Sequence, residues 1–451
     1  MSRLVDASPP AKAHITALSK IGYDFNAAVS DIIDNSITAR SKNINIEFYI
    51  TNGVAIFVIA DDGYGMSEDS LIASMSIGCK DPADDRCDGD LGRFGAGLKT
   101  ASFSQARVLS VISKTENSTI SAAVWDKDIV ETQGWLLQVL EPNEIDGIVP
   151  KGSALSKSGT IVRWDNIGVI RELLHSPDKQ LQIDKLCSAL HSHIGLYFHR
   201  FLSGPTSINI KINNRIVEAI DPFMRVIKGA EELASTSLRS DKGKIAITAY
   251  RLPFFTNMTR AQLDSYGGEA SIRQGQGLYI YREKRLIIAG GWMGMSKLSG
   301  LAGLARIQVD IPATLDNEWS TDVKKSSLQI PSKVRDQIRR LISKPVASSK
   351  GAYTYRGKQE VANTFWLINN DERNKLITYQ IDPTNTDLKA IAACLPPNSK
   401  REFAQYLTSL AVAIPMNHIY AAMNNTPSSI SQDNLTDEEK ILDLIASLND
   451  E

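Results

Sequence analysis

The sequence predicts an α/β protein of two or three domains, and three observations lead to this expectation. The chain has 451 residues, which is more than a single hydrophobic core usually organises. Strand and helix patterns alternate over its first 170 residues. A second series of such patterns runs from about Arg171 to Lys344. We therefore expect one domain at 1–170, a second at 171–345 and a smaller C-terminal region at 346–451.

The elements of the first domain can be placed in order. The segment 11–39 has a helical pattern that is broken near Gly22. Strands are expected at 44–50 and 54–60, because the Asn52-Gly53 pair between them favours a tight hairpin turn. The remaining expected elements are a helix at 67–77 and strands at 107–113, 118–125, 135–140 and 160–164. Together they predict a sandwich in which helices cover one face of a sheet.

The second and third regions contain fewer clear patterns. In the second region, the expected elements are a long helix at 181–202 and strands at 208–212, 245–251 and 277–288. A connector that contains serine, glycine and lysine is expected at 348–357. Beyond it, the expected elements are a small strand pair at 365–366 and 377–381, helices at 401–414 and 418–423, and an acidic helix at 436–448.

A run of spaced glycines that ends in a lysine is the most informative segment of the chain. Gly92, Gly95 and Gly97 precede Lys99, and small residues that start a helix follow. Glycine lets the backbone approach a ligand closely, and free N–H groups at a helix N-terminus attract anions. Polyphosphate is the natural ligand, although a glycine-rich surface turn has the same composition. The run is not a Walker A loop, because Leu98 stands where that motif needs glycine.

A carboxylate and a carboxamide lie on one face of the helix predicted around 29–39. Asp31 and Asn35 are four residues apart, so both project from the same side. The carboxylate can accept a proton from a water molecule, and the amide oxygen can ligate a hard cation. A polar, solvated helix face would contain the same pair.

An acidic residue and two glycines follow the second predicted strand. Asp61 ends this strand, and Gly63 and Gly65 come directly after it. A carboxylate at a strand end can accept a hydrogen bond from the exocyclic amino group of adenine, and the glycines keep the pocket floor free of side chains. A plain turn between a strand and a helix would also fit this segment.

In this order and at these spacings, the three segments resemble the GHKL ATPase superfamily, which contains DNA gyrase B, MutL, heat-shock chaperones, histidine kinases and MORC proteins. A fourth match is Gly159-Thr160, and the glycine run is closest to the MORC sequence. The resemblance implies a Bergerat-type sandwich that binds ATP and Mg²⁺, with Asn35 as the magnesium ligand. The residues that it implies at the nucleotide are Asn35, Asp61, Gly63, Gly65, Met66, Gly92, Phe94, Gly95, Ala96, Gly97, Leu98, Lys99 and Thr160.

The resemblance implies Asp31 as the general base for ATP hydrolysis. Hydrolytic members of the superfamily carry glutamate at this position, whereas this chain has aspartate. The shorter side chain would leave the carboxylate about 1–1.5 Å further from the attacking water, which can cost on the order of 100-fold in rate. We therefore expect ATP binding with slow hydrolysis.

The second region resembles the S5-like transducer domain of the MORC, MutL and gyrase B branches. The segments that carry the likeness are 210–215 and 281–287. In these branches a transducer lysine reaches the γ-phosphate, and Lys324 or Lys325 is the candidate here, although a solvated charge pair is an equally good interpretation. The implied mechanism is a clamp in which ATP orders residues 78–97 and two chains dimerise.

Composition limits the partners. Lys and Arg number 50 and Asp and Glu 51, so the net charge of −1 argues against general coating of nucleic acid but leaves room for a local basic face. No apolar run is long enough to span a bilayer, and no signal peptide pattern is present. The four cysteines are scattered, which favours reduced thiols. We expect a cytoplasmic protein without a membrane partner.

Several classes of function compete at this point. The leading one is an ATP-dependent dimerising switch that acts on DNA, or with a DNA-processing or defence partner. A chaperone-like remodeller would need a long charged linker or a large client-binding segment, which we do not see. A histidine kinase would need a phosphoacceptor helix hairpin before the ATPase, and the chain starts too close to Asp31 to hold one. A nucleotide-binding module without turnover is a further alternative, because of the aspartate at this position.

Overall fold

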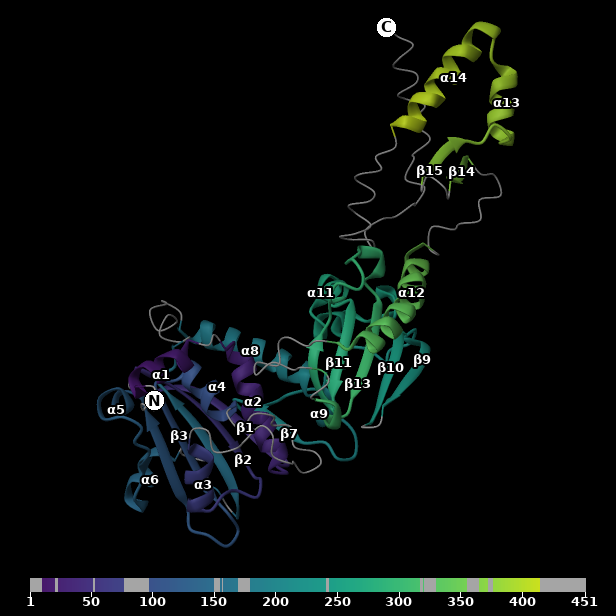
Figure 1. Cartoon of the computed structure of the whole chain (residues 1–451). Coiled ribbons are helices and arrows are strands. Elements are labelled where there is room, and N and C mark those ends of the chain that lie inside the picture. The colour runs from purple at the N-terminus through teal and green to yellow at the C-terminus, as the bar shows by residue number, and fades with distance from the viewer. Residues whose placement is uncertain are drawn as a thin grey trace, which may run out of the picture.

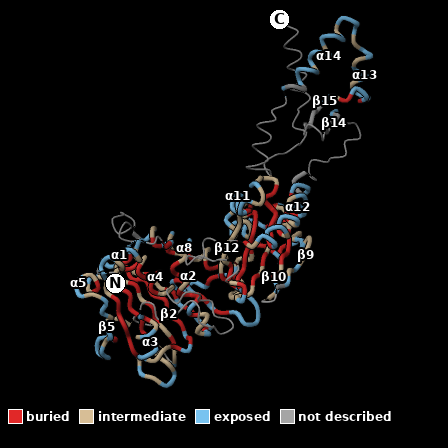
Figure 2. Tube along the Cα trace, viewed as in Figure 1, coloured by how far each residue is buried: buried red, intermediate tan, exposed pale blue. Residues whose placement is uncertain are grey.

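A computed structural model of the chain contains two main sheets with helices packed against them (Figure 1). Buried residues follow the strands of both sheets (Figure 2). The predicted α/β class is therefore confirmed. The residues that the structure describes are 10–20, 23–51, 53–76, 97–149, 155, 157–168, 179–240, 243–316, 319, 330–354, 365–371 and 376–413.

The first sheet has eight strands in the order β5-β4-β3-β6-β2-β1-β7-β8. Their bounds are β1 Asn43–Thr51, β2 Val54–Asp61, β3 Val108–Lys114, β4 Ser121–Asp126, β5 Gln138–Val139, β6 Gly159–Asp165, β7 Asn209–Ile212 and β8 Arg215–Ile216. The predicted hairpin is confirmed, since β1 and β2 pair antiparallel and Gly53 in the turn has a φ of 75°. Of the strand predicted at 135–140, two residues pair with β4 at an exposed edge.

Helices cover one face of this sheet. They are α1 Ala11–Ser19, α2 Phe25–Thr38, α3 Glu68–Met75, α4 Gly97–Gln105, α5 Lys127–Gln133 and α8 Lys179–Tyr197. The side chain of Asp24 caps α2 by accepting hydrogen bonds from the Asn26 and Ala27 amides. Phe25 then packs edge-on against Phe57 of β2, inside one large core. The opposite face, for which the sequence predicted no helix, is partly covered by the short helix α6 (Pro142–Ile148).

The second sheet has five strands in the order β12-β11-β13-β10-β9. Their bounds are β9 Glu231–Ser240, β10 Gly243–Arg251, β11 Gly277–Arg282, β12 Arg285–Ala289 and β13 Ala305–Ile311. The helices that follow or accompany them are α9 His199–Leu202, α10 Arg260–Ser265, α11 Gly268–Gln274 and α12 Ser332–Thr354, with short 3₁₀ turns at Phe255–Asn257, Gly300–Ala302 and Ala313–Leu315. Val334, Ile338 and Ile342 of α12 are buried in the core of this second sheet.

The first sheet and helix α12 both extend past the boundaries expected from the sequence. β7 pairs in parallel with β1, so the first sheet takes up residues beyond 170. Helix α12 continues to Thr354, so position 345 lies inside a helix and part of the connector expected at 348–357 is helical. The long helix expected at 181–202 is interrupted at Phe198. We therefore propose that the first module ends after β8 and the second after α12.

A small C-terminal group completes the described residues. It consists of the hairpin β14 Trp366–Asp371 with β15 Leu376–Ile381, and of α13 Thr386–Cys394 and α14 Pro397–Val412. The strand expected at 377–381 and the helix expected at 401–414 are confirmed apart from their ends. The helices expected at 418–423 and 436–448 lie outside the described residues. Among the described helices, none has the length and apolarity needed to cross a bilayer.

Candidate functional site

Asp61 is held at the end of β2 by donors from three different elements. The Ser36 hydroxyl of α2 donates to one carboxylate oxygen at 2.8 Å, and the Gly63 amide donates to the other at 2.9 Å. The side chain also accepts from the Thr160 backbone, on the strand paired with β2. Burial raises the pKa of Asp61, and these hydrogen bonds oppose the rise. The result is a fixed, buried acceptor with oxygen lone pairs left for a further donor.

The two glycines after Asp61 are required by close packing. A Cβ at Gly63 would lie 2.7 Å from the Ala39 Cβ at the end of α2. Gly65 has a φ of 68°, and a Cβ there would lie 1.9 Å from the Lys114 carbonyl oxygen. Glycine is therefore the residue that lets the chain turn sharply away from Asp61.

Thr160 and Met66 meet beside this carboxylate, through a residue that the sequence did not single out. The Ser113 hydroxyl of β3 lies 2.9 Å from the Thr160 hydroxyl and accepts a hydrogen bond from the Met66 amide at 2.9 Å. It also donates to the Gly159 carbonyl. Ser113 thus joins two predicted motifs that are nearly a hundred residues apart, and no local sequence pattern indicates it.

Asp62, next to Asp61, has a different role. Its carboxylate accepts from the Ser41 hydroxyl and from the backbone amides of Lys42 and Asn43. Partial burial would raise its pKa, but these hydrogen bonds outweigh the burial and hold the pKa below the usual value. Asp62 therefore fastens the connection between α2 and β1 to the end of β2, whereas Asp61 is the aspartate held beside the glycine turn.

Helix α2 and the start of α4 bring the second group of predicted residues together. Asn35 is exposed on α2, one turn after Asp31. A Cβ at Gly97, the first residue of α4, would lie 3.7 Å from the Asp31 Oδ2 atom. Gly97, the last glycine of the run, therefore lies beside the predicted general base. The glycine-run residues Gly92, Phe94, Gly95 and Ala96 lie outside the described residues, as do Lys324 and Lys325.

The side chain of Lys99 contacts the end of α3. Its side chain is buried, and its ammonium group donates to the carbonyl oxygens of Ser74 and Ser76 at 2.9 and 2.6 Å. These carbonyls lie at the C-terminal end of α3, where a cation is favourable. Leu98 packs against the first core. A direct contact of Lys99 or Leu98 with phosphate stays a prediction.

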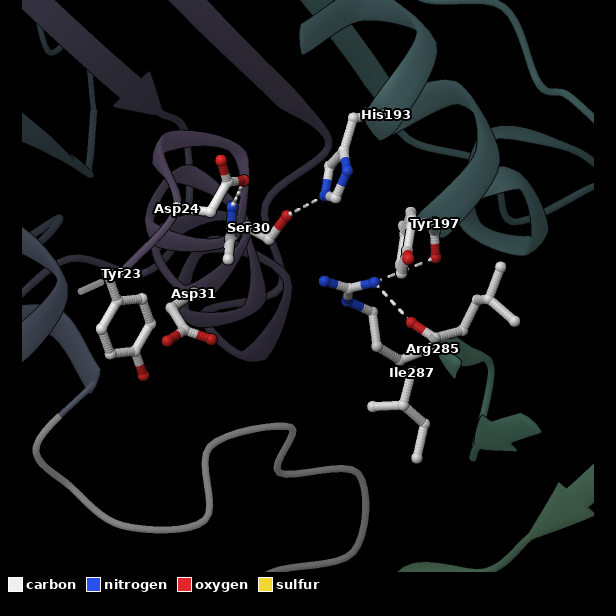
Figure 3. Close-up of a pocket in the computed structure, with 10 residues that line it drawn as sticks. Tyr23, Asp24, Ser30, Asp31, His193, Tyr197, Arg285 and Ile287 are labelled. Carbon is white, nitrogen blue, oxygen red and sulfur yellow. Dashed lines mark hydrogen bonds between the residues drawn. The ribbon is translucent and has the colours of Figure 1, made fainter. Parts of the chain in front are cut away.

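A cavity of about 300 Å³ lies where α2 faces α8 and β12 (Figure 3). Asp31 lies on its α2 side, and Arg285 enters from β12 of the second sheet. His193 of α8 also lines it, 3.0 Å from the Ser30 hydroxyl. Burial and the nearby Arg285 charge lower the pKa of His193 to about 4, so the imidazole is neutral at pH 7.

Arg285 forms a buried ion pair with Asp34 of α2. Its Nε donates to the Asp34 carboxylate at 2.9 Å, and the two side chains are 8% and 2% exposed. The guanidinium also lies 3.9 Å from the centre of the Phe198 ring and donates to the Tyr197 carbonyl. Asp34 directly precedes Asn35 in the chain. The second sheet is thereby joined to the helix that carries Asp31 and Asn35, a contact that the sequence did not reveal.

Comparison with known proteins identifies the class of this module. Residues 23–160 match the family of histidine kinase-, DNA gyrase B-, and HSP90-like ATPases. This part of the chain is therefore similar to the ATP-binding domains of the GHKL superfamily. Over 125 residues the chain is also 27% identical to "ATPase morc-1" of Caenorhabditis elegans, and the expected likeness to MORC-type ATPases is confirmed there. The aligned segment covers 27% of this chain and 14% of that relative.

Proposed function

We propose that the chain is an ATP-dependent molecular switch, which hydrolyses ATP slowly and dimerises while ATP is bound. The GHKL match supports ATP binding, and the site geometry is consistent with it. The buried Asp61, the half-buried Thr160 and the glycine turn form a polar group at the end of β2. Gly97 at the start of α4 lies beside Asp31 of α2, and Asn35 is exposed one turn further along α2, which supports a phosphate site between these helices.

The residues present fit ATP and Mg²⁺. Asp61 would accept a hydrogen bond from the adenine amino group, since Ser36 and Gly63 hold its carboxylate in place. Asn35 would offer its exposed amide oxygen to Mg²⁺, which would balance the phosphate charge. Asp31 would accept the proton of the attacking water. Its short side chain is the reason that we expect slow turnover.

The buried ion pair between Arg285 and Asp34 is the observation that best supports a switch. Asp34 is fixed on the same helical turn as Asn35, so a shift of α2 on nucleotide binding would act directly on Arg285. An ion pair with little access to water is costly to separate. We therefore expect β12 to follow α2, which would pass the nucleotide state to the second sheet. Lys324 or Lys325 stays our candidate for the γ-phosphate contact.

The partners of the switch are proposed from the resemblance to MORC-type ATPases. We propose that two copies form the ATP-bound dimer, and that the target is DNA or a DNA-processing or defence protein. A nucleotide-binding module without turnover is the second candidate function. Asp31 favours it, because this residue is one methylene shorter than the glutamate of hydrolytic relatives.

The test is to restore the longer side chain. Phosphate release should rise on the order of 10- to 100-fold in Asp31→Glu, because the carboxylate comes closer to the attacking water. Asp31→Ala should abolish release and hold the protein as an ATP-bound dimer in light scattering. Asp24→Asn is a matched control, because Asp24 lines the same cavity and asparagine also caps helices.

The outcomes separate the two candidate functions. An unchanged rate of phosphate release in Asp31→Ala would show that Asp31 is not the base. ATP binding without measurable release in both the native chain and Asp31→Glu would favour the module without turnover. A monomer in ATP, ADP and a non-hydrolysable analogue would contradict the clamp.

A further inference from the structure

Helix α12 carries a dense group of exposed cations. Five basic residues stand between Ser332 and Lys344, against the single acidic residue Asp336. We call this group the α12 basic face; its members are Lys333, Arg335, Arg339, Arg340 and Lys344, and all of them are exposed. The whole chain is close to neutral, so this local excess is a property of the helix.

Helix α12, which carries the α12 basic face, is held in place by buried apolar residues. The helix lies against the second sheet (Figure 1). Val334, Ile338 and Ile342 anchor the helix in the second core. Lys333, Arg340 and Lys344 are spaced by seven and four residues, so they follow one line along the helix. Arg335 and Arg339 lie on the other exposed flank of the helix, about 140° further round its axis. Both sets precede Pro345, where the helix loses a backbone hydrogen bond.

These cations differ from three other arginines of the second module. Arg273, Arg282 and Arg285 each pair with a carboxylate within 3 Å. On α12, Arg339 lies 4.0 Å from Asp336, and both side chains are more than half exposed. Such an exposed ion pair contributes little to the stability of the fold. For the other four members, no ion pair is found with a carboxylate in the described part of the chain. Their charge is available to a partner.

We propose that the α12 basic face binds the phosphate backbone of duplex DNA. This inference rests on the proposed function, because it supplies the surface for the proposed DNA target. The exposed residues among 332–344 are all polar or charged, whereas the centre of a protein interface is usually apolar. Lys333 and Lys344 are about 16 Å apart along the axis at 1.5 Å per residue. Over that length a duplex carries about ten phosphates.

The experiment measures duplex binding by fluorescence anisotropy at several salt concentrations. It compares the full chain with a triple variant, Lys333→Gln, Arg340→Gln and Lys344→Gln, in the presence of a non-hydrolysable ATP analogue. Each lost phosphate contact lowers the slope of log K against log salt by about 0.9, so we expect the slope to fall by about 2 to 3. A matched control removes three exposed lysines elsewhere, as Lys12→Gln, Lys211→Gln and Lys228→Gln.

The outcomes distinguish a failure of the α12 proposal from a failure of the proposed function. A reduced slope in the α12 variant, with the control like the native chain, supports the proposal. Equal slopes in the native chain and the α12 variant overturn it, while DNA binding itself stands. Binding of polyglutamate in preference to DNA also overturns it. ATP turnover without any DNA binding overturns the surface and leaves the ATPase intact, and phosphate release is therefore measured on the same samples.

Discussion

At the scale of single residues, the pKa values of the adjacent Asp61 and Asp62 are shifted in opposite directions. Burial raises the pKa of Asp61, so the native state gains stability from its protonated form at low pH and loses it as pH rises through the folded pKa. We therefore expect Asp61→Asn to melt at the same or a higher temperature at pH 7. ATP affinity should still fall on the order of 100-fold, because a charged acceptor is lost. Calorimetry and nucleotide titration measure the two effects.

Asp62→Asn is the natural comparison. Hydrogen bonds from Ser41, Lys42 and Asn43 hold the pKa of Asp62 below its usual value. The ionised carboxylate therefore stabilises the folded protein at pH values above the pKa of the unfolded state. This stabilisation is lost as the pH falls through the pKa of the folded state. This variant should therefore lose stability at pH 7 and keep its ATP affinity. If Asp62→Asn instead lost ATP and Asp61→Asn retained it, the adenine assignment would be wrong.

At the scale of elements, the turn between β2 and α3 depends on one backbone conformation. Gly65 has a positive φ, and a Cβ would meet the Lys114 carbonyl at 1.9 Å. We expect Gly65→Ala to lower the free energy of unfolding by about 3 kcal/mol or more, since left-handed strain and a backbone clash combine. Urea unfolding measures this loss.

Gly53→Ala provides the control for conformation alone. Gly53 has a similar φ of 75°, but nothing lies within 4 Å of the position that a Cβ would occupy, because the residue is at the open tip of the β1–β2 hairpin. Its loss should be about 1–2 kcal/mol. Equal losses in the two variants would mean that packing against β3 contributes nothing to the site turn.

The sequence predicted elements best where local signals agree. The hairpin at Asn52-Gly53 and the strand that ends at Asp61 each combine a clear apolar pattern with a turn signal. Helix α12 was missed, because Pro345 and many charged residues obscure its apolar stripe. The strand predicted at 135–140 was too long, because an apolar run does not show which of its residues pair with a neighbouring strand at a sheet edge.

At the scale of the whole molecule, the decisive contacts join distant parts of the chain. The glycine motifs indicated a nucleotide site from the sequence, since each is local. Ser113 beside Thr160 and Arg285 on Asp34 could not be predicted, because they depend on strand order and on how the sheets meet. In particular, 251 positions separate Asp34 from Arg285.

The Arg285–Asp34 pair gives the last prediction. Removing one partner leaves a buried charge uncompensated, so Asp34→Asn and Arg285→Gln should each cost about 3–5 kcal/mol. The double variant should cost clearly less than the sum, because both charges are gone. If the pair also couples the modules, the double variant will bind ATP, yet an ATP analogue will no longer alter hydrogen exchange in β11 and β12. Retained exchange changes in that variant would show that the nucleotide state reaches the second sheet by another contact.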